Sequence, residues 1–229
     1  MTIYILTLFP EMFRGVFEKS IIARSIANKL LDIRLINLRD FGLGKRKIVD
    51  DKPYGGGKGM VLMAQPIVEA LHSIKSKPYI ILLSASGKKY TQKTAKFLAG
   101  KKSIAIICGH YEGVDARVEG YANTIISIGD FILTGGEIPS MAVVDSVTRL
   151  IPGAINKKSL ESESFSLGSP KRKFWGDLEY PQYTRPPIYN RKKVPTVLLS
   201  GNHKQISKWR EKQSLKKTIK FRPDLLKNS

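Results

Sequence analysis

The chain has 229 residues, 42% of them hydrophobic and 25% charged, which is the composition of a soluble globular protein. Its 39 Lys and Arg against 19 Asp and Glu give a net charge of +20, which favours a nucleic acid partner because neutralised phosphates release counterions. The alternative is a lysine-rich surface without such a partner. A single cysteine excludes an internal disulfide and a cysteine-cluster metal site, and the three histidines lack zinc-ligand spacing.

The sequence shows no membrane or export segment. No apolar run approaches the roughly 18 residues of a transmembrane helix. Met1–Leu8 lacks the basic start and long apolar stretch of a signal peptide. We therefore expect a cytoplasmic protein without membrane association.

Strands and helices are predicted to alternate through the first 150 residues. Short apolar runs predict strands at Ile3–Leu8, Ile33–Asn37, Pro78–Ser84, Ser103–Cys108 and Asn123–Ile128. Helical patterns are found at Glu11–Leu31, Tyr90–Ala99 and Glu137–Leu150. Such alternation predicts an α/β domain with a parallel sheet.

The pattern breaks at residues 154–190, which are rich in Pro, Gly, Ser and charges and predict a linker or active-site segment, mobile in part. Asn202 then caps a predicted helix at His203–Phe221. Its apolar side is predicted to consist of Ile206, Trp209, Leu215 and Ile219. Residues 190–229 hold 12 Lys and Arg against 2 Asp and Glu, half of the chain's excess charge.

Three glycine-rich loops follow predicted strands: Ser84–Gly87, Cys108–Asp115 and Ile128–Gly136. Ligands of α/β sheets bind beyond the carboxyl ends of the strands. A tight turn explains each loop alone, whereas the three together favour a shared pocket for a nucleoside. The glycine order of ATPases and of dinucleotide-binding enzymes is absent, which weakens both of those hypotheses.

Asp50–Leu62 (DDKPYGGGKGMVL) is the most unusual segment, because three consecutive glycines lose much conformational entropy when they become ordered. It is either a flexible loop or a loop that closes on a base, with Tyr54 available for stacking.

Motifs along nearly the whole chain together carry a family resemblance. They are LFPEMF (8–13), VDDKPYGGGKGM (49–60), ICGHYEGVDARV (107–118), SIGDFILTGGEIPSM (127–141), VTRLIPG (147–153), LEYPQYTRP (178–186), VPTVLLSGNH (194–203) and WREKQSLKKT (209–218). In this order they resemble the bacterial tRNA (guanine-N1)-methyltransferase family, TrmD.

The resemblance implies a SPOUT-type α/β fold, whose parallel sheet is threaded into a deep trefoil knot, followed by a small, mainly helical domain. It implies three parts: a knotted domain that binds S-adenosylmethionine at 1–158, a flexible linker and active-site segment at 159–180, and a basic tRNA-binding domain at 181–229. It also implies an obligate homodimer and, as substrate, the guanosine at position 37 of tRNA.

The resemblance also assigns site residues. Those implied for S-adenosylmethionine are Leu83, Ser84, Gly87, Gly109, Glu112, Ser127, Ile128, Gly129, Phe131, Ile132, Leu133, Gly135 and Gly136. Those implied for the substrate are Tyr54, Gly55, Gly59, Arg185 and His203. Glu112 either neutralises the positive end of the donor or helps to bind a divalent cation, so a magnesium ion stays an open alternative. No protein metal site is expected.

Methylation of guanine N1 requires removal of its proton, which a carboxylate can accept, while a guanidinium can stabilise the charge that develops on O6. The resemblance maps the base to Glu163, where the family usually has aspartate, and the guanidinium to Arg149. Asp177 and Glu179 are alternative bases.

Two further departures from the family pattern are Ala85, where proline is common, and an apparent insertion at Leu167–Phe174. Two other functions stay open. One is a knotted methyltransferase acting on ribose or on ribosomal RNA, and the other is an RNA-binding protein without catalytic activity.

Overall fold

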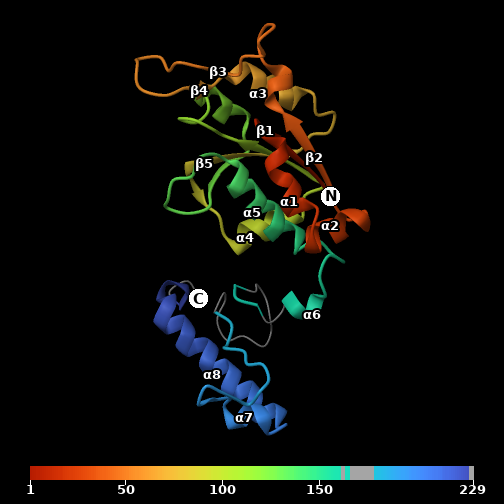
Figure 1. Cartoon of the computed structure of the whole chain (residues 1–229), viewed down its shortest axis with the longest axis vertical. Helices are drawn as coiled ribbons and strands as arrows, with labels where there is room; N and C mark the ends of the chain where they lie inside the picture. Colours follow the sequence, from red (N-terminus) through yellow and green to blue (C-terminus); the bar gives the residue numbers. More distant parts are fainter. Residues whose placement is uncertain (161–162, 166–177, 227–229) are drawn as a thin grey trace. The chain divides into compact units, whose positions relative to one another are not determined.

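The computed structural model describes residues 1–160, 163–165 and 178–226 (Figure 1). The chain divides into two compact units, Met1–Ile155 and Asn156–Ser229. Each unit is described by itself below.

The first unit is built on a five-stranded parallel sheet. Its strands are β1 (Thr2–Thr7), β2 (Asp32–Asn37), β5 (Tyr79–Lys89), β6 (Ser103–Cys108) and β7 (Thr124–Ser127). They lie in the order β2-β1-β6-β5-β7, and every neighbouring pair is parallel. The α/β class and the parallel sheet predicted from the sequence are confirmed.

α-Helices, 3-10 helices (η) and one short pair of strands connect the strands of the sheet. The 3-10 helices are η1 (Pro10–Phe13), η2 (Leu38–Phe41) and η3 (Ala116–Tyr121), and the short strands are β3 (Asp50–Asp51) and β4 (Val61–Leu62). The α-helices are α1 (Arg14–Phe17), α2 (Ser20–Ala27), α3 (Ala64–His72), α4 (Gln92–Ala99) and α5 (Glu137–Thr148).

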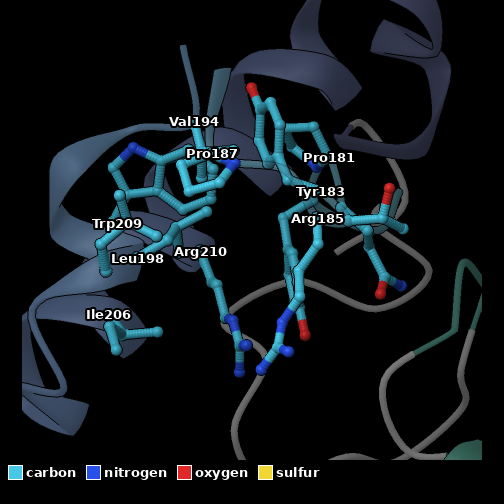
Figure 2. A pocket seen from close by; sticks show the side chains of 13 residues that line it. Pro181, Tyr183, Arg185, Pro187, Val194, Leu198, Ile206, Trp209 and Arg210 are labelled. Atoms are coloured by element: carbon cyan, nitrogen blue, oxygen red, sulfur yellow. The ribbon is translucent and has the colours of Figure 1, made fainter. Parts of the chain in front are cut away.

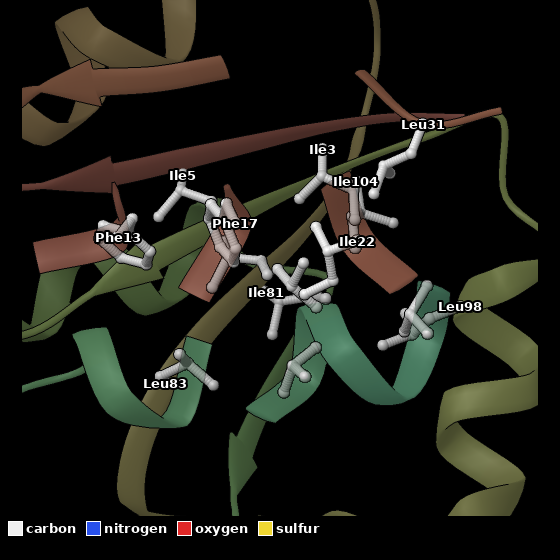
Figure 3. Close-up of a cluster of buried hydrophobic side chains, with 14 of the residues drawn as sticks. Ile3, Ile5, Phe13, Phe17, Ile22, Leu31, Ile81, Leu83, Leu98 and Ile104 are labelled. Carbon is white, nitrogen blue, oxygen red and sulfur yellow. The ribbon is translucent and has the colours of Figure 1, made fainter. Parts of the chain in front are cut away.

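Two apolar layers cover the two faces of the sheet, because successive strand residues point to opposite sides. On β1, Ile3 and Ile5 belong to one buried cluster, whereas Tyr4 and Leu6 belong to the other. The first cluster packs the sheet against α1, α2, α4 and α5, and Figure 3 shows Phe17, Ile22 and Leu98 within it. The second packs the opposite face against α3 and η2.

The helix predicted over Glu11–Leu31 is interrupted, and this prediction was wrong. The segment forms η1, α1 and α2, because Lys19 is extended and Ser20 has a φ of +56°. The turn redirects the chain so that Phe17 and Ile22 both enter the same core cluster. Helix α3 was not predicted from the sequence.

The second unit consists of α6 (Lys157–Leu160), a hairpin of β8 (Ile188–Tyr189) and β9 (Lys192–Lys193), α7 (Thr196–Leu199), α8 (His203–Phe221) and η4 (Pro223–Leu226). The predicted bounds of α8 are confirmed, and the Asn202 side chain accepts a hydrogen bond from the Gln205 amide at 3.1 Å, as a cap does.

The predicted apolar side of α8 is only partly right. Ile219 is 54% exposed, whereas the buried residues of the helix are Ser214 and Thr218. Both hydroxyls bind the backbone of Leu178: Ser214 Oγ donates to its carbonyl, and its amide donates to Thr218 Oγ1 at 2.9 Å. The helix therefore packs through small polar residues that pair with an extended chain.

Candidate functional site

A pocket of about 400 Å³ lies beyond the carboxyl ends of β6 and β7 and against the middle of β5, the strand between them in the sheet. Leu83 and Ser84 of β5, the loop after β6 and the loop after β7 supply most of its lining. This is where α/β sheets bind ligands, and the volume is in the range of small-molecule sites.

The predicted donor residues come together here, with one exception. Those that line the pocket are Leu83, Ser84, Gly109, Glu112, Ser127, Ile128, Gly129, Phe131, Ile132, Leu133, Gly135 and Gly136. Gly87 does not line it. A Cβ at Gly87 would lie 2.6 Å from the backbone of Ile126, so this glycine allows β5 and β7 to approach closely.

Other lining residues were not assigned from the sequence. They are Leu82, Ala85, His110, Tyr111, Gly113, Val114, Glu119, Ile126, Thr134 and Pro139. Glu119 and Pro139 lie on η3 and α5, so the search for glycine-rich strand ends could not find them. Among the described residues, the charged side chains of the lining are Glu112 and Glu119, and none is Lys or Arg.

Backbone contacts hold the two glycine-rich loops together. The Gly136 amide donates to the Gly109 carbonyl at 2.7 Å, and His110 forms a bridge with Gly135. The Ser127 hydroxyl donates to the Gly129 carbonyl at 2.9 Å and so fixes the turn after β7. These contacts shape the pocket wall.

A buried carboxylate lies behind the pocket wall. Glu137, the first residue of α5, is 2% exposed and accepts a hydrogen bond of 2.7 Å from Thr7 Oγ1. His110 Nδ1 lies 3.7 Å from Glu137 Oε2, too far for a hydrogen bond. The amino terminus of α5 favours the negative charge. Burial, together with the Glu137 charge, raises the pKa of the Cys108 thiol well above its usual value, so this cysteine is inert as a nucleophile.

The unusual segment Asp50–Leu62 is anchored to the pocket loop. Its ends, β3 and β4, pair antiparallel (Figure 1). Tyr54, which lies between them in the chain, is fully exposed. The Glu112 amide donates to the Met60 carbonyl at 3.1 Å. A Cβ at Gly59, which has a φ of +85°, would lie 2.4 Å from Glu112 Oε1.

The substrate residues predicted on this segment, Tyr54, Gly55 and Gly59, thus lie on a loop whose base contacts the pocket at the ends of β6 and β7. Gly55 has a φ of +83°, a conformation that favours glycine. Asp115 caps η3 and pairs with Arg117 through contacts of 2.6 and 2.9 Å, which lower the pKa of its carboxyl group to about 2.

The two predicted catalytic residues lie in different units. Arg149 is half-buried and follows the last turn of α5, where its amide donates to the Asp145 carbonyl at 3.1 Å. Glu163 is half-buried in the second unit. The alternative base Asp177 and the predicted insertion Leu167–Phe174 lie outside the described residues. The other alternative, Glu179, has its amide bound to Ser164 Oγ at 3.0 Å.

The remaining predicted substrate residues lie in the second unit. His203 is exposed at the start of α8. Arg185 lines a second pocket, of about 360 Å³, together with Tyr183, Trp209 and Arg210 (Figure 2). Sequence reasoning did not find this pocket.

Within the described ranges, no three His, Cys, Asp or Glu side chains are grouped so that they could hold a metal ion. Across the same residues, no helix is both long and apolar enough to cross a membrane.

Comparison with known proteins identifies relatives along the whole chain. A family model described as tRNA (Guanine-1)-methyltransferase TrmD matches residues 1–228. A tRNA (guanine-N(1)-)-methyltransferase of Geobacillus kaustophilus is 52% identical over 231 residues, covering 99% of this chain and 91% of the relative. The proteins of that name from Dictyoglomus turgidum and Clostridium botulinum strain 657 are each 50% identical, covering 98% and 99% of this chain and 89% and 92% of the relative. The chain therefore belongs to the tRNA (guanine-1)-methyltransferase family TrmD.

Proposed function

We propose that this protein transfers a methyl group from S-adenosylmethionine to N1 of the guanosine at position 37 of tRNA. The observation that carries the proposal is the pocket at the ends of β6 and β7 in a member of this family. The names of the relatives support the coarser activity, methylation of guanine N1 in tRNA.

The pocket fits the methyl donor in its chemistry. The donor supplies a methyl group that is already activated on a positively charged sulfur. Glu112 and Glu119 are the charged residues of the lining, so the pocket favours a cationic ligand over an anionic one. Phe131 and Leu133 offer apolar surface to an adenine ring, since they are 54% and 36% exposed. Backbone groups of Gly109 and of residues 127–136 would form hydrogen bonds with the polar edges of the adenine ring.

The chain's own residues then prepare the acceptor. Glu163 accepts the N1 proton as the methyl group arrives, and Arg149 stabilises the negative charge that spreads to O6. The base has to leave its stack to reach the pocket. The loop that carries Tyr54, Gly55 and Gly59 covers it there, and Arg185 and His203 contact the RNA.

The active assembly is a cytoplasmic homodimer, and the first unit carries the trefoil knot of its family. Exposed apolar side chains around the pocket support a covering partner, because Ile132 is 84% and Ile138 49% exposed. Such a partner would bring its second unit to this pocket and so unite Arg149 with Glu163. Light scattering of the purified protein tests the dimer, and a monomer at micromolar concentration would contradict it.

A single-turnover assay tests the reaction with tRNA transcripts that carry guanosine or adenosine at position 37. We expect methylation of the first transcript alone. Glu163→Gln should lose a factor of about 10² to 10⁴ in rate, the usual range for a general base, while donor affinity is retained. Glu163→Asp, the family's usual residue, should stay active.

The outcomes separate the alternatives. An unchanged rate in Glu163→Gln would move the base to Glu179 or Asp177, each testable by the same substitution. Donor binding without any methylated product would favour an RNA-binding protein without catalysis. Methylation of the adenosine-37 transcript at ribose would favour the other class of knotted methyltransferase.

A further inference from the structure

The pocket of the second unit takes no part in the methyl transfer proposed above, although its residue Arg185 is proposed there to contact the RNA. It has a volume of about 360 Å³ and lies between the segment 180–187, α7 and α8. Its lining combines the aromatic residues Tyr180, Tyr183 and Trp209 with prolines and aliphatic side chains (Figure 2). An apolar pocket lined by several aromatic side chains is unusual on a unit as basic as this one.

The ring faces in this pocket are not covered by one another. The centroids of Tyr183 and Trp209 lie 6.4 Å apart, and their planes are tilted by 53°, so the two rings do not stack. Tyr183 is 48% exposed. Exposed aromatic faces are the surfaces on which unpaired bases stack in single-strand binding proteins.

Both charged residues of the lining, Arg185 and Arg210, are cationic and exposed. In Figure 2 their guanidinium groups point to the same side of the pocket. The Arg210 guanidinium lies 4.8 Å from the centroid of the Tyr180 ring. A guanidinium that rests on a ring face keeps its N–H groups at the edge, where they can bind phosphate.

A cationic hairpin lies next to the same pocket, because the residues on either side of it line the pocket. Pro187 and Val194, which both line the pocket, are joined by a hydrogen bond of 2.9 Å from the Val194 amide to the Pro187 carbonyl. The β8–β9 hairpin between them carries the exposed residues Arg191, Lys192 and Lys193. The hairpin thus adds three positive charges next to the two arginines.

We propose that this pocket binds one unpaired nucleoside of the RNA substrate, with the base against Tyr183 and Trp209 and the adjoining phosphates at Arg185 and Arg210. Apolar ring faces beside cations match a base attached to phosphate. The acceptor guanine has to face the donor pocket, whose lining among the described residues comes from the first unit, so we assign a different nucleoside to the second pocket. The identity of the RNA rests on the proposed function, whereas binding in this pocket needs no methyl donor.

Fluorescence of Trp209 tests the proposal directly. The chain has two tryptophans, so Trp175→Phe in the full-length protein leaves Trp209 as the single reporter. The probes are a single-stranded oligoadenylate of five nucleotides and an abasic ribose-phosphate chain of the same length, without S-adenosylmethionine. We expect saturable quenching by the oligoadenylate and an affinity about five- to a hundredfold higher than that of the abasic chain, the range for one stacked base.

Variants in the same background separate stacking from general attraction. Tyr183→Leu keeps an apolar side chain and should reduce the preference for the chain that contains bases. Arg210→Ala should weaken both probes and lower the slope of log affinity against log salt by about 0.7 for each lost phosphate contact. Lys216→Ala removes an exposed cation of α8 that does not line the pocket, and we expect a smaller change.

Equal affinity for the two probes would overturn the proposal, as would a loss in Lys216→Ala equal to that in Arg210→Ala. Unchanged KM for tRNA in Tyr183→Leu would refute the link to the RNA substrate. A protein that prefers the oligoadenylate but methylates no tRNA would refute the proposed function and leave the nucleoside pocket standing.

Discussion

Gly136→Ala tests whether the two glycine-rich loops must touch for the donor pocket to form. A Cβ at Gly136 would lie 2.6 Å from Cys108 Cα and 2.9 Å from the Gly109 amide nitrogen. The neighbouring atoms belong to the backbone of β6 and cannot rotate away. To bring the distance between the new Cβ and Cys108 Cα from 2.6 Å to an ordinary contact of about 3.4 Å, the end of β6 and the start of α5 have to separate by about 0.8 Å.

This separation breaks a contact that shapes the pocket. It lengthens the hydrogen bond between the Gly136 amide and the Gly109 carbonyl from 2.7 Å to about 3.5 Å, where it is lost. Overpacking by about 1–3 kcal/mol and a lost hydrogen bond of about 1 kcal/mol give a destabilisation of about 2–4 kcal/mol. We expect donor affinity to fall at least about tenfold, since every 1.4 kcal/mol of lost binding energy is a factor of ten.

Urea denaturation measures the first effect, and titration calorimetry with S-adenosylmethionine measures the second. Gly15→Ala is the matched control, because a Cβ there meets nothing within 4 Å and the residue lies in α1. It should stabilise the protein by about 0.5–1 kcal/mol and leave donor affinity unchanged. If Gly136→Ala behaved like Gly15→Ala, the inference that the loops shape the pocket by direct contact would be wrong.

Three further predictions concern contacts between distant or exposed residues. Thr7→Val removes the hydrogen-bond donor of the buried Glu137 carboxylate and should cost about 1–3 kcal/mol in urea denaturation. The matched control is Thr124→Val, at a half-buried position of the edge strand β7, which should cost less than about 0.5 kcal/mol. The Asp115 carboxyl should titrate near pH 2 by NMR, since its hydrogen bonds with Arg117 lower its pKa from the usual 3.8 to about 2. The stability from its pair with Arg117 is therefore present above pH 3.8 and lost as the pH falls toward 2, and Arg117→Ala should return the pKa to the usual range. Thr218→Val leaves the Leu178 amide unpaired and should destabilise the second unit by about 1–3 kcal/mol, whereas Ile219→Ser on the exposed side should change little.

The strands could be predicted from the sequence because parallel strands buried on both faces are continuous apolar runs. Ile104–Cys108 is fully buried, and the run SIAIIC marks the strand without help from its neighbours. Two of the three pocket segments could be located for a related reason, because they directly follow the runs of β6 and β7 and the carboxyl ends of parallel strands meet at one edge. The third predicted loop, Ser84–Gly87, was wrong, because β5 continues through it to Lys89.

The features that failed depend on contacts between residues far apart in the chain. The break at Lys19–Ser20 brings Phe17 and Ile22 into one core cluster. A hydrophobic pattern with helical period looks the same with or without this break, so it could not predict it. Thr7 and Glu137 are 130 residues apart, so no local pattern pairs them. On α8, hydrophobicity favoured Ile219 as a core residue. The residues buried instead are Ser214 and Thr218, because their hydroxyl groups bind the backbone of Leu178.

The two pockets carry opposite charges, and this opposition constrains the function more than the net charge does. A chain with a charge of +20 would by composition alone place cations around any concave site. The donor pocket instead has Glu112 and Glu119 as its charged residues, while the pocket of the second unit has Arg185 and Arg210. An anionic cofactor such as a nucleoside triphosphate would be repelled from the first pocket and attracted to the second. If the first pocket binds the cationic methyl donor and the second binds RNA, as we propose, the same rule directs the two ligands to different sites and lets both bind at once.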